Sequence, residues 1–329
     1  MISRVEDFAA AHGWKDAAVE PLKADASFRR YFRLRNGTSG ALVMDAPPGK
    51  EDVRPWVRMA RHLCALGYSA PRVMAADESA GLVLLEDLGD DTFTRLLAAG
   101  ADEASLYNLA VDVLIDLHRR PASQAVPSGL PPYDDRRFLD EAALLTDWFL
   151  PAVGAPCAAN AREQYLSLWQ EALAVVRSAP DTLVLRDYHV DNLMRVAGRS
   201  GIAQCGLLDF QDAVRGPPAY DFVSLVEDAR RDVSAAVREE ARRRYLAAFP
   251  ALDVAAFDAA CAVLGAQRHA KVIGIFTRLH RRDGKAQYLV HIPRIWRLLE
   301  RALGHEKLRE VRGWFDANVP AKLRTAPPA

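Results

Sequence analysis

The residues best suited to chemistry in this sequence lie in and just after the segment 185–194. Asp187 is followed five positions later by Asn192, in the order Arg-Asp-x-x-x-x-Asn, and Asp209 ends the apolar run at 202–208. An ionised aspartate accepts a proton from a hydroxyl, and carboxylate and amide oxygens are ligands for hard cations such as Mg2+. The three residues therefore suggest proton transfer beside a bound cation.

A predicted hairpin brings two of these residues together. Residues 193–196 and 202–208 read as strands joined by a Gly-rich turn, and in an antiparallel hairpin the start of the first strand lies beside the end of the second. Asn192 is then next to Asp209, where magnesium would neutralise charge on nucleotide phosphates while Asp187 assists an attacking hydroxyl. The alternative is that the aspartates only cap turns, as Asp often does. Their meeting at one hairpin favours the catalytic interpretation.

The elements that must position these residues change in character along the chain. Strands are predicted at 19–23, 31–34, 41–45 and 81–86, with a hairpin turn at Asn36–Gly37 and a helix at 53–66. Helical periodicity then dominates, and strand patterns return only around the segment with Asp187. We therefore expect an α+β fold of two lobes with the active site in the cleft. Residues 1–88 would form a nucleotide-binding sheet with one main helix, and residues 89–329 a helical lobe with the catalytic loop, the hairpin and the substrate pocket.

Composition excludes several other classes of protein. The 43 basic residues balance 43 acidic ones, so no overall charge attracts nucleic acid or an anionic membrane. No run approaches the roughly 20 apolar residues of a membrane span, and the N-terminus lacks the pattern of a secretory signal. Four scattered cysteines without a Cys-x-x-Cys pair indicate reduced thiols. We expect a cytoplasmic protein that acts on a small molecule and shows no sign of an obligatory protein partner.

Several motifs resemble the aminoglycoside phosphotransferase family of protein-kinase-like enzymes. They are residues 187–192 (DYHVDN), 208–212 (LDFQD) and 216–221 (GPPAYD). More narrowly, residues 24–33 (ADASFRRYFR), 186–189 (RDYH), 274–279 (GIFTRL) and 282–285 (RDGK) resemble the subgroup of anomeric N-acetylmuramate/N-acetylglucosamine kinases. The likeness extends over nearly the whole chain.

This resemblance implies a protein-kinase-like fold with ATP and Mg2+ as cofactors. Asp187 would be the catalytic base, and Asn192 and Asp209 the metal ligands. The crossover from Glu86 to Leu88 would offer backbone hydrogen bonds to adenine.

Two further residues are expected to support the loop. His189 would shape it, although a histidine between Asp187 and Asn192 is also a possible base. Asp221 would anchor the loop by resemblance, whereas its position at the start of an apolar helix is equally typical of an N-cap.

The nucleotide end departs from the family pattern. The turn between the first two strands has no Gly-rich loop, the third strand has no lysine, and the following helix has no interior glutamate to pair with one. The phosphates still need a cation, and Arg30 and Arg33 are candidates. Strand alternation places these two on opposite faces, so only one would point inward. Donors at Ser27 would supplement it, and ordinary surface arginines are the alternative.

The predicted acceptor end is basic. Residues 268–312 contain twelve Lys and Arg against four Asp and Glu. This favours a neutral or anionic acceptor over a polycationic aminoglycoside. Arg278, Asp283 and Lys285 are candidate substrate contacts, with a solvated helix face as the alternative.

We therefore expect an ATP-dependent phosphotransferase with an alcohol acceptor, which phosphorylates the anomeric hydroxyl of N-acetylmuramate, N-acetylglucosamine or both in peptidoglycan recycling. The alternatives are a kinase of another small hydroxyl compound (an aminoglycoside, choline or homoserine) and a pseudokinase that only binds nucleotide. The missing lysine and Gly-rich loop motivate the pseudokinase, while the presence of the base and both metal ligands argues against it.

Overall fold

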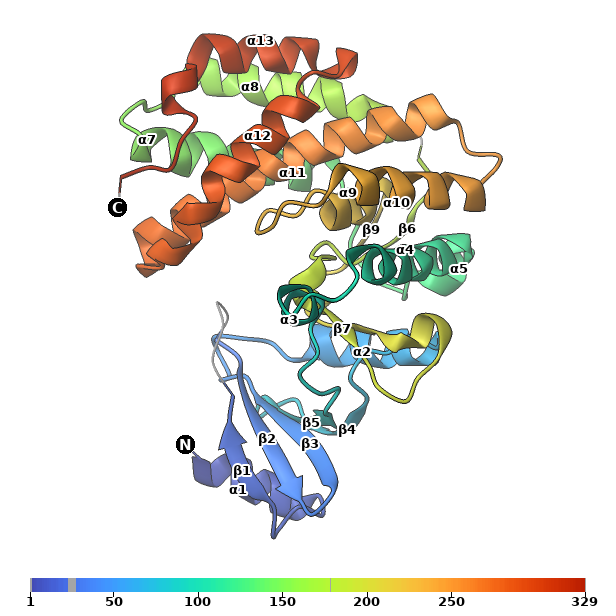
Figure 1. Ribbon diagram of the computed structural model, residues 1–329. Coiled ribbons are helices and arrows are strands. Elements are labelled where there is room, and N and C mark those ends of the chain that lie inside the picture. The colour runs from blue at the N-terminus through green and yellow to red at the C-terminus, as the bar shows by residue number, and fades with distance from the viewer. Residues whose placement is uncertain (1, 23–27, 178, 329) are drawn as a thin grey trace. The chain divides into compact units, whose positions relative to one another are not determined.

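The computed structural model of the chain describes residues 2–22, 28–177 and 179–328 (Figure 1). The described chain divides into two compact units. The first runs to Val113 and includes Val190–Ala213, and the second consists of Leu114–His189 and the remainder from Val214. One boundary falls within helix α4 (Glu103–Arg119). The segment with Asn192 and Asp209 thus groups with the N-terminal strands. The lobe boundary at residues 88 and 89 stays a prediction.

The first unit is built on a five-stranded antiparallel sheet in the order β1-β2-β3-β5-β4. Its strands are β1 (Ala18–Pro21), β2 (Arg30–Asn36), β3 (Ser39–Asp45), β4 (Val73–Asp77) and β5 (Leu82–Glu86). The predicted turn at Asn36–Gly37 is confirmed, because Asn36 pairs with Ser39 and Gly37 has a φ of 58°. Strand β4 was not predicted.

One face of this sheet packs into a hydrophobic core, and the other lines a pocket. Helix α1 (Ile2–Ala11) packs Val5 and Ala9 against one face, into a core with Phe32, Leu34, Ala41, Val43, Leu82 and Leu84. Because side chains alternate along a strand, Tyr31 and Arg33 point to the other face. That face lines a pocket.

The predicted hairpin is confirmed as β7 (Leu193–Arg195) and β8 (Cys205–Leu207), with Leu193 opposite Leu207. A 3-10 turn, Val190–Asn192, leads into it, and a second one, Gly201–Gln204, replaces the start of the predicted second strand. The hairpin packs closely, since a Cβ at Gly206 would lie 2.9 Å from Val196 and 3.2 Å from Leu88. The unit also contains α2 (Arg54–Ala65) and α3 (Phe93–Ala98).

The second unit is mainly helical. Its helices are α5 (Ala122–Ala125), α6 (Asp135–Leu144), α7 (Leu150–Ala152), α8 (Ala159–Ala172), α9 (Ala219–Val226), α10 (Ala235–Ala248), α11 (Val254–Asp283), α12 (Ile292–Ala302) and α13 (Arg309–Asn318). A short two-stranded sheet pairs β6 (Thr182–Val184) with β9 (Val214–Gly216). The predicted α+β composition, strands first and helices after, is confirmed.

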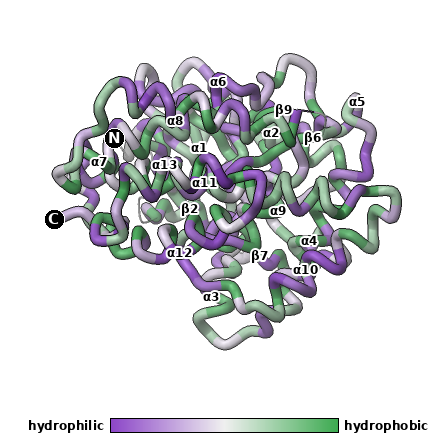
Figure 2. Tube along the Cα trace, turned by 90° about the horizontal axis from the view of Figure 1, so that it is seen from above, coloured by the Kyte–Doolittle hydropathy of each residue, from purple (hydrophilic) through white to green (hydrophobic). Residues whose placement is uncertain are grey.

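Helix α11 is the centre of this unit and packs against α6, α9 and α12 (Figure 1). All eight residues of α9 are buried, whereas α10 is largely hydrophilic (Figure 2). A π-helical turn, Leu145–Phe149, follows α6 and also contacts α11.

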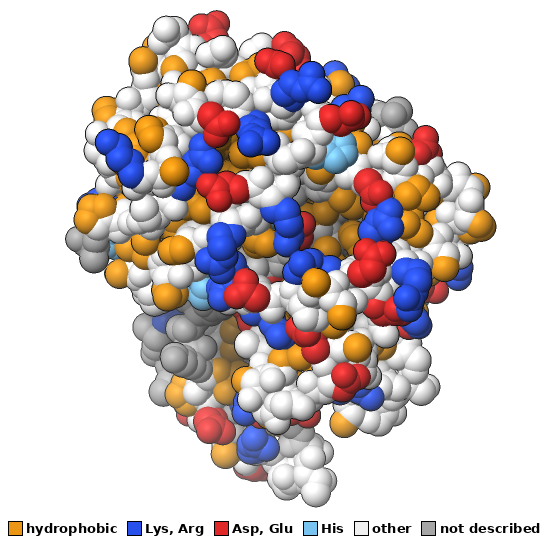
Figure 3. Space-filling view, turned by 45° about the horizontal axis from the view of Figure 1, so that its top comes forward, with side chains coloured by type: hydrophobic (Ala, Val, Ile, Leu, Met, Phe, Trp, Pro, Cys, Tyr) orange, Lys and Arg blue, Asp and Glu red, His pale blue; other side chains and the backbone are white. Residues whose placement is uncertain are grey.

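The charged side chains on the face displayed in Figure 3 are interspersed, with acidic and basic groups side by side. This agrees with the balanced composition. None of the described helices combines the length and the apolar character needed to cross a membrane.

Candidate active site

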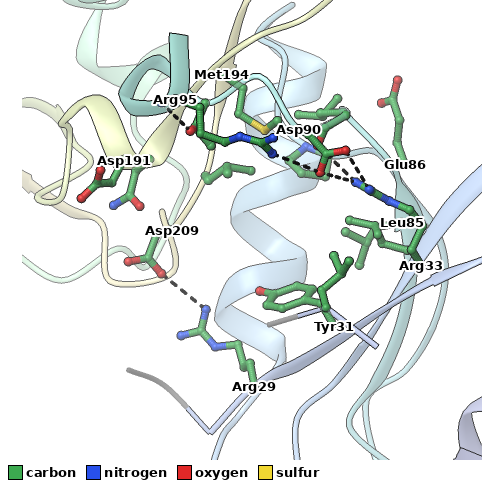
Figure 4. Close-up of a pocket in the computed structure, with 18 of the residues that line it drawn as sticks. Arg29, Tyr31, Arg33, Leu85, Glu86, Asp90, Arg95, Asp191, Met194 and Asp209 are labelled. Carbon is green, nitrogen blue, oxygen red and sulfur yellow. Dashed lines mark hydrogen bonds and ion pairs between the residues drawn. The ribbon is translucent and has the colours of Figure 1, made fainter. Parts of the chain in front are cut away.

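A pocket of about 420 Å³ lies within the first unit (Figure 4). Polar groups line part of it, among them Arg29, Asn192 and Asp209. Its apolar wall includes Leu42, Trp56, Leu85, Leu88, Met194 and Leu208. The pocket therefore offers both an apolar surface for a flat ring and a polar end for charged groups.

The hairpin β7–β8 presents Asn192 and Asp209 to this pocket. The N–H of Leu208, just after β8, donates at 2.9 Å to the carbonyl oxygen of Asn192, just before β7. Asp209 is the next residue after Leu208, so the hairpin brings it close to Asn192. Asp209 has a φ of 56°, a left-handed conformation that is uncommon for a residue with a side chain. Its side chain is 45% exposed. Such backbone strain is concentrated at functional positions.

The donor set at the hairpin fits a magnesium ion that is shared with phosphates. Among the described residues, no group of three or more His, Cys, Asp or Glu could hold a metal on its own. Magnesium, however, is usually bound through one or two protein oxygens, with phosphate oxygens and waters completing the shell. Asn192 and Asp209 provide one amide oxygen and one carboxylate for that purpose.

Arg29 is the cation that lies beside this polar end, and the sequence analysis did not single it out. Its guanidinium lies 3.6 Å from Asp209 (Figure 4). It also lies 3.5 Å from Glu51 and donates to Gln211 at 2.8 Å. Gln211 in turn donates to Asp209 at 3.0 Å. Arg29 directly precedes β2 and lines the pocket together with Tyr31 and Arg33.

The two arginines considered from the sequence lie on opposite faces of the sheet. Arg33 lines the pocket, but Asp87 and Asp90 hold its guanidinium at 2.7 and 2.9 Å. Arg30 does not line the pocket, because strand alternation directs it to the α1 face, where it donates to the buried Asp45 at 2.6 Å. Ser27 lies outside the described residues.

The end of β5 forms the apolar side of the pocket. The N–H of Glu86 donates to Arg72 at 2.9 Å, and its carboxylate pairs with Arg199. Leu88 is 8% exposed and packs on Met194 and Val196. Within the part of the chain that the structure describes, neither the N–H nor the carbonyl of Leu88 makes a hydrogen bond.

Asp187 belongs to the second unit and follows β6. The preceding residue, Arg186, has a φ of 69°. The buried carboxylate of Asp221 fixes this turn, since it accepts from the N–H of Leu185 at 2.6 Å and of Arg186 at 2.9 Å. Burial raises the pKa of Asp221 to about 7. Asp221 does not cap α9, whose N-cap position is Pro218.

Positive charges keep Asp187 ionised. Burial by itself raises the pKa of this carboxyl, but nearby cations outweigh burial and hold the pKa below its ordinary value. The strongest of these charges is Lys271, and Arg268 and Arg186 also contribute. An ionised carboxylate is the form that accepts a proton.

His189 is buried and contacts a neighbouring arginine. It is 4% exposed, and burial lowers its pKa. Its Nε2 lies 3.2 Å from Nη1 of Arg230, and because a guanidinium can only donate, Nε2 is the acceptor. The lone pair that a base would need is therefore engaged.

The three candidate substrate contacts lie at or beyond the end of α11. Arg278 is partly buried, and its Nε is buried without a partner among the described residues. Asp283 is exposed and pairs with its neighbour Arg282 at 2.8 Å. Lys285 follows Gly284, which ends the helix with a φ of 70°.

Comparison with known proteins agrees with this arrangement. The phosphotransferase enzyme family (APH) matches residues 18–257. The chain belongs to this family. It is 37% identical to the N-acetylmuramate/N-acetylglucosamine kinase of Caulobacter vibrioides, over 96% of both chains. It is also 37% identical to the kinase of the same name from Pseudomonas aeruginosa, over 94% of this chain and 92% of that protein.

Solved structures of the phosphotransferase family share the fold at lower identity. A putative aminoglycoside phosphotransferase from Ralstonia eutropha has a TM-score of 0.67 at 15% identity, covering 94% of this chain and 98% of its own. The GDP complex of aminoglycoside 2'-phosphotransferase-IIIa has a TM-score of 0.64 at 16% identity, covering 92% and 98%. The predicted protein-kinase-like fold of two lobes is confirmed.

Proposed function

We propose that this chain is a kinase that transfers the γ-phosphoryl group of ATP to the anomeric hydroxyl of N-acetylmuramate, N-acetylglucosamine or both, in peptidoglycan recycling. The observation that carries the proposal is the pocket of the first unit, whose apolar wall ends at Asn192 and Asp209. Membership of a phosphotransferase family supports the reaction. The names of relatives that match nearly the whole chain support the acceptor.

Each end of the pocket suits one part of the nucleotide. Leu88 has a backbone N–H and a carbonyl available for adenine, and the apolar wall suits its ring. Arg29 is the cation we assign to the phosphates in place of the absent lysine, because its guanidinium lies 3.6 Å from the candidate metal ligand Asp209, whereas Arg33 pairs with Asp87 and Asp90.

The division of labour follows from charge. Asp187 accepts the proton of the acceptor hydroxyl. The hydroxyl oxygen forms a bond to the γ-phosphorus while the bond from the γ-phosphorus to the bridging β-phosphate oxygen breaks, which leaves a sugar phosphate and ADP. Asn192 and Asp209 would hold magnesium, which neutralises phosphate charge when bound. Asp221 holds the turn before Asp187 in place, and His189, which accepts from Arg230, shapes the loop after it. We assign the reaction to the cytoplasm, where ATP is the phosphoryl donor, and the four scattered cysteines agree with reducing surroundings.

The test is product formation from ATP with each reducing sugar and with its methyl glycoside, in which the anomeric hydroxyl is blocked. We expect phosphorylation of the free sugars and none of the glycosides. Equal turnover of a methyl glycoside would exclude the anomeric hydroxyl as the acceptor. Choline, homoserine and an aminoglycoside belong in the same panel, because preferential turnover of one of them would replace the proposed acceptor.

A further inference from the structure

One face of helix α11 carries a row of basic side chains that are withdrawn from solvent. Arg268, Lys271 and Arg278 are three and seven residues apart, so helical periodicity places them along one face. Arg268 is 4% exposed and Lys271 is 7% exposed, while Arg278 is partly buried. Lysine and arginine are rarely buried unless they are paired.

Lys271 follows this rule. Its ammonium lies 3.1 Å from a carboxylate oxygen of Glu141 and donates to the hydroxyl of Tyr220 at 3.3 Å. Glu141 also pairs with Arg186 and accepts from Tyr133. The buried charge of Lys271 is therefore balanced within the unit.

Arg268 is an exception to the rule that buried basic side chains are paired. In the described part of the chain, its guanidinium makes no hydrogen bond and no ion pair, and its Nη1 is buried without a partner. Arg33, which is also buried, pairs with Asp87 and Asp90. A buried charge without a partner costs several kcal/mol, by the general magnitude for such groups.

The position of Arg268 indicates what its partner is. Its charge acts on Asp187, and also on Asp221 in α9, which packs against α11. Among the described residues it forms no ion pair with either carboxylate, so its buried Nη1 is available to a group that is not part of the chain. A guanidinium binds carboxylates and phosphates through two parallel hydrogen bonds.

We propose that Arg268 binds an oxyanion of the reacting molecules beside Asp187. The proposal rests on the proposed function, which supplies two such oxyanions: the carboxylate of N-acetylmuramate and the phosphoryl group in transfer. Arg278, whose Nε is likewise buried without a partner, lies ten residues further along the same face, about 15 Å along the axis.

The first experiment measures binding without turnover. We expect N-acetylmuramate or inorganic phosphate to raise the melting temperature of the unmodified protein, and Arg268→Met to abolish that rise. The unliganded variant should melt at the same temperature as the unmodified protein or higher, because an unpaired buried charge has been removed. Arg282→Met is the matched control, since Arg282 lies on the same helix but is more than half exposed.

The second experiment distinguishes the two oxyanions by comparing N-acetylmuramate with N-acetylglucosamine, which lacks the carboxylate. If Arg268 binds the carboxylate, Arg268→Met raises KM about tenfold or more for N-acetylmuramate only. If it binds the phosphoryl group, kcat falls by a similar factor for both sugars while both KM values stay the same.

An unliganded Arg268→Met variant that melts at a lower temperature and keeps the anion response would overturn the proposal, because Arg268 would then be structural. So would unchanged kinetics with both sugars. If the unmodified protein phosphorylates neither sugar, the proposed function fails, and the melting response to phosphate still decides whether Arg268 binds an oxyanion.

Discussion

At the scale of single residues, the charges around Asp187 determine how activity should depend on pH. The pKa of Asp187 lies below its ordinary value because cations, Lys271 first among them, outweigh the effect of burial. A carboxylate with a depressed pKa stays ionised until the pH falls below that pKa. Activity that depends on Asp187 as a base should therefore persist through mildly acidic pH.

Replacing Lys271 by methionine should raise the pH below which activity falls. The substitution removes the strongest stabilising charge, so the pKa of Asp187 rises and kcat/KM begins to fall at a higher pH. The measurement is a profile of kcat/KM against pH for the variant, with Arg282→Met as the control. A profile that keeps its acidic limb in place would show that Lys271 does not act on the base.

The base itself is tested by Asp187→Asn. We expect kcat to fall about 100- to 10,000-fold, the usual range for loss of a general base. Nucleotide binding should not change, because the pocket lies within the first unit and Asp187 does not. Measuring kcat together with the Kd for ADP separates a chemical defect from a binding defect, and retention of kcat would assign the proton transfer to another group.

Asp221 fixes the backbone before Asp187 rather than contacting substrate. Asp221→Asn keeps one acceptor oxygen but turns an NH2 group toward the second backbone N–H. A buried donor without a partner costs about 1–3 kcal/mol, so we expect that loss in the free energy of unfolding. We also expect a fall in kcat at unchanged nucleotide affinity. Chemical denaturation provides the first value, and a variant as stable as the unmodified protein would contradict the role.

At the scale of elements, Gly274 sets how closely α11 approaches the end of α6. A Cβ at this position would lie 2.3 Å from the carbonyl carbon of Leu144, just before the π-helical turn Leu145–Phe149. Backbone cannot move aside as a flexible side chain can. The π turn and the close approach therefore belong to one packing arrangement, which also aligns Lys271 with Glu141.

Gly274→Ala should destabilise the protein by about 1–3 kcal/mol through overpacking, despite alanine's better helix propensity. Gly313→Ala is the matched control, because Gly313 lies in α13 with nothing within 4 Å of its added Cβ. That control should stabilise the protein by about 0.5–1 kcal/mol. Opposite signs in thermal or urea unfolding support the packing argument, and a neutral Gly274→Ala would refute it.

At the scale of the whole molecule, the sequence predicted what depends on local pattern. The hairpin that brings Asn192 to Asp209 follows from two apolar runs around a Gly-rich turn, and the succession of strands and helices follows from periodicity. The short strands β4 and β9 were missed, because their pairing depends on tertiary partners rather than on local propensity.

The burial of the cations in α11 could not be predicted from local pattern. Arg268 and Lys271 lie in the middle of a long helix, and a local pattern does not say which face will be enclosed by α6 and α9. Arg29 was not predicted either, because it lies before the predicted strand 31–34 and before β2. Its contacts with Asp209, Glu51 and Gln211 depend on tertiary packing that local pattern does not specify.

The division of the chain into two units leads to a last prediction, that nucleotide affinity and acceptor chemistry respond to different substitutions. Every described residue that lines the 420 Å³ pocket belongs to the first unit, and the guanidinium of Arg29 lies 3.6 Å from Asp209. Arg29→Gln should therefore raise the Kd for ADP with magnesium about tenfold or more, the value of a lost charged hydrogen bond. Arg268→Met, in the second unit, should leave that Kd unchanged.

Magnesium removal sharpens the comparison. If Asn192 and Asp209 hold the ion, chelation with EDTA should weaken ADP binding to the unmodified protein and have little further effect on Asp209→Asn, which has already lost a charged ligand. Isothermal titration of ADP into the unmodified protein and into Asp209→Asn, each with and without EDTA, measures these effects, and Arg29→Gln is titrated in the same way. Equal sensitivity of the two proteins to EDTA would place the metal elsewhere, whereas additive losses from Arg29→Gln and EDTA would show that the cation and the metal hold the phosphates independently.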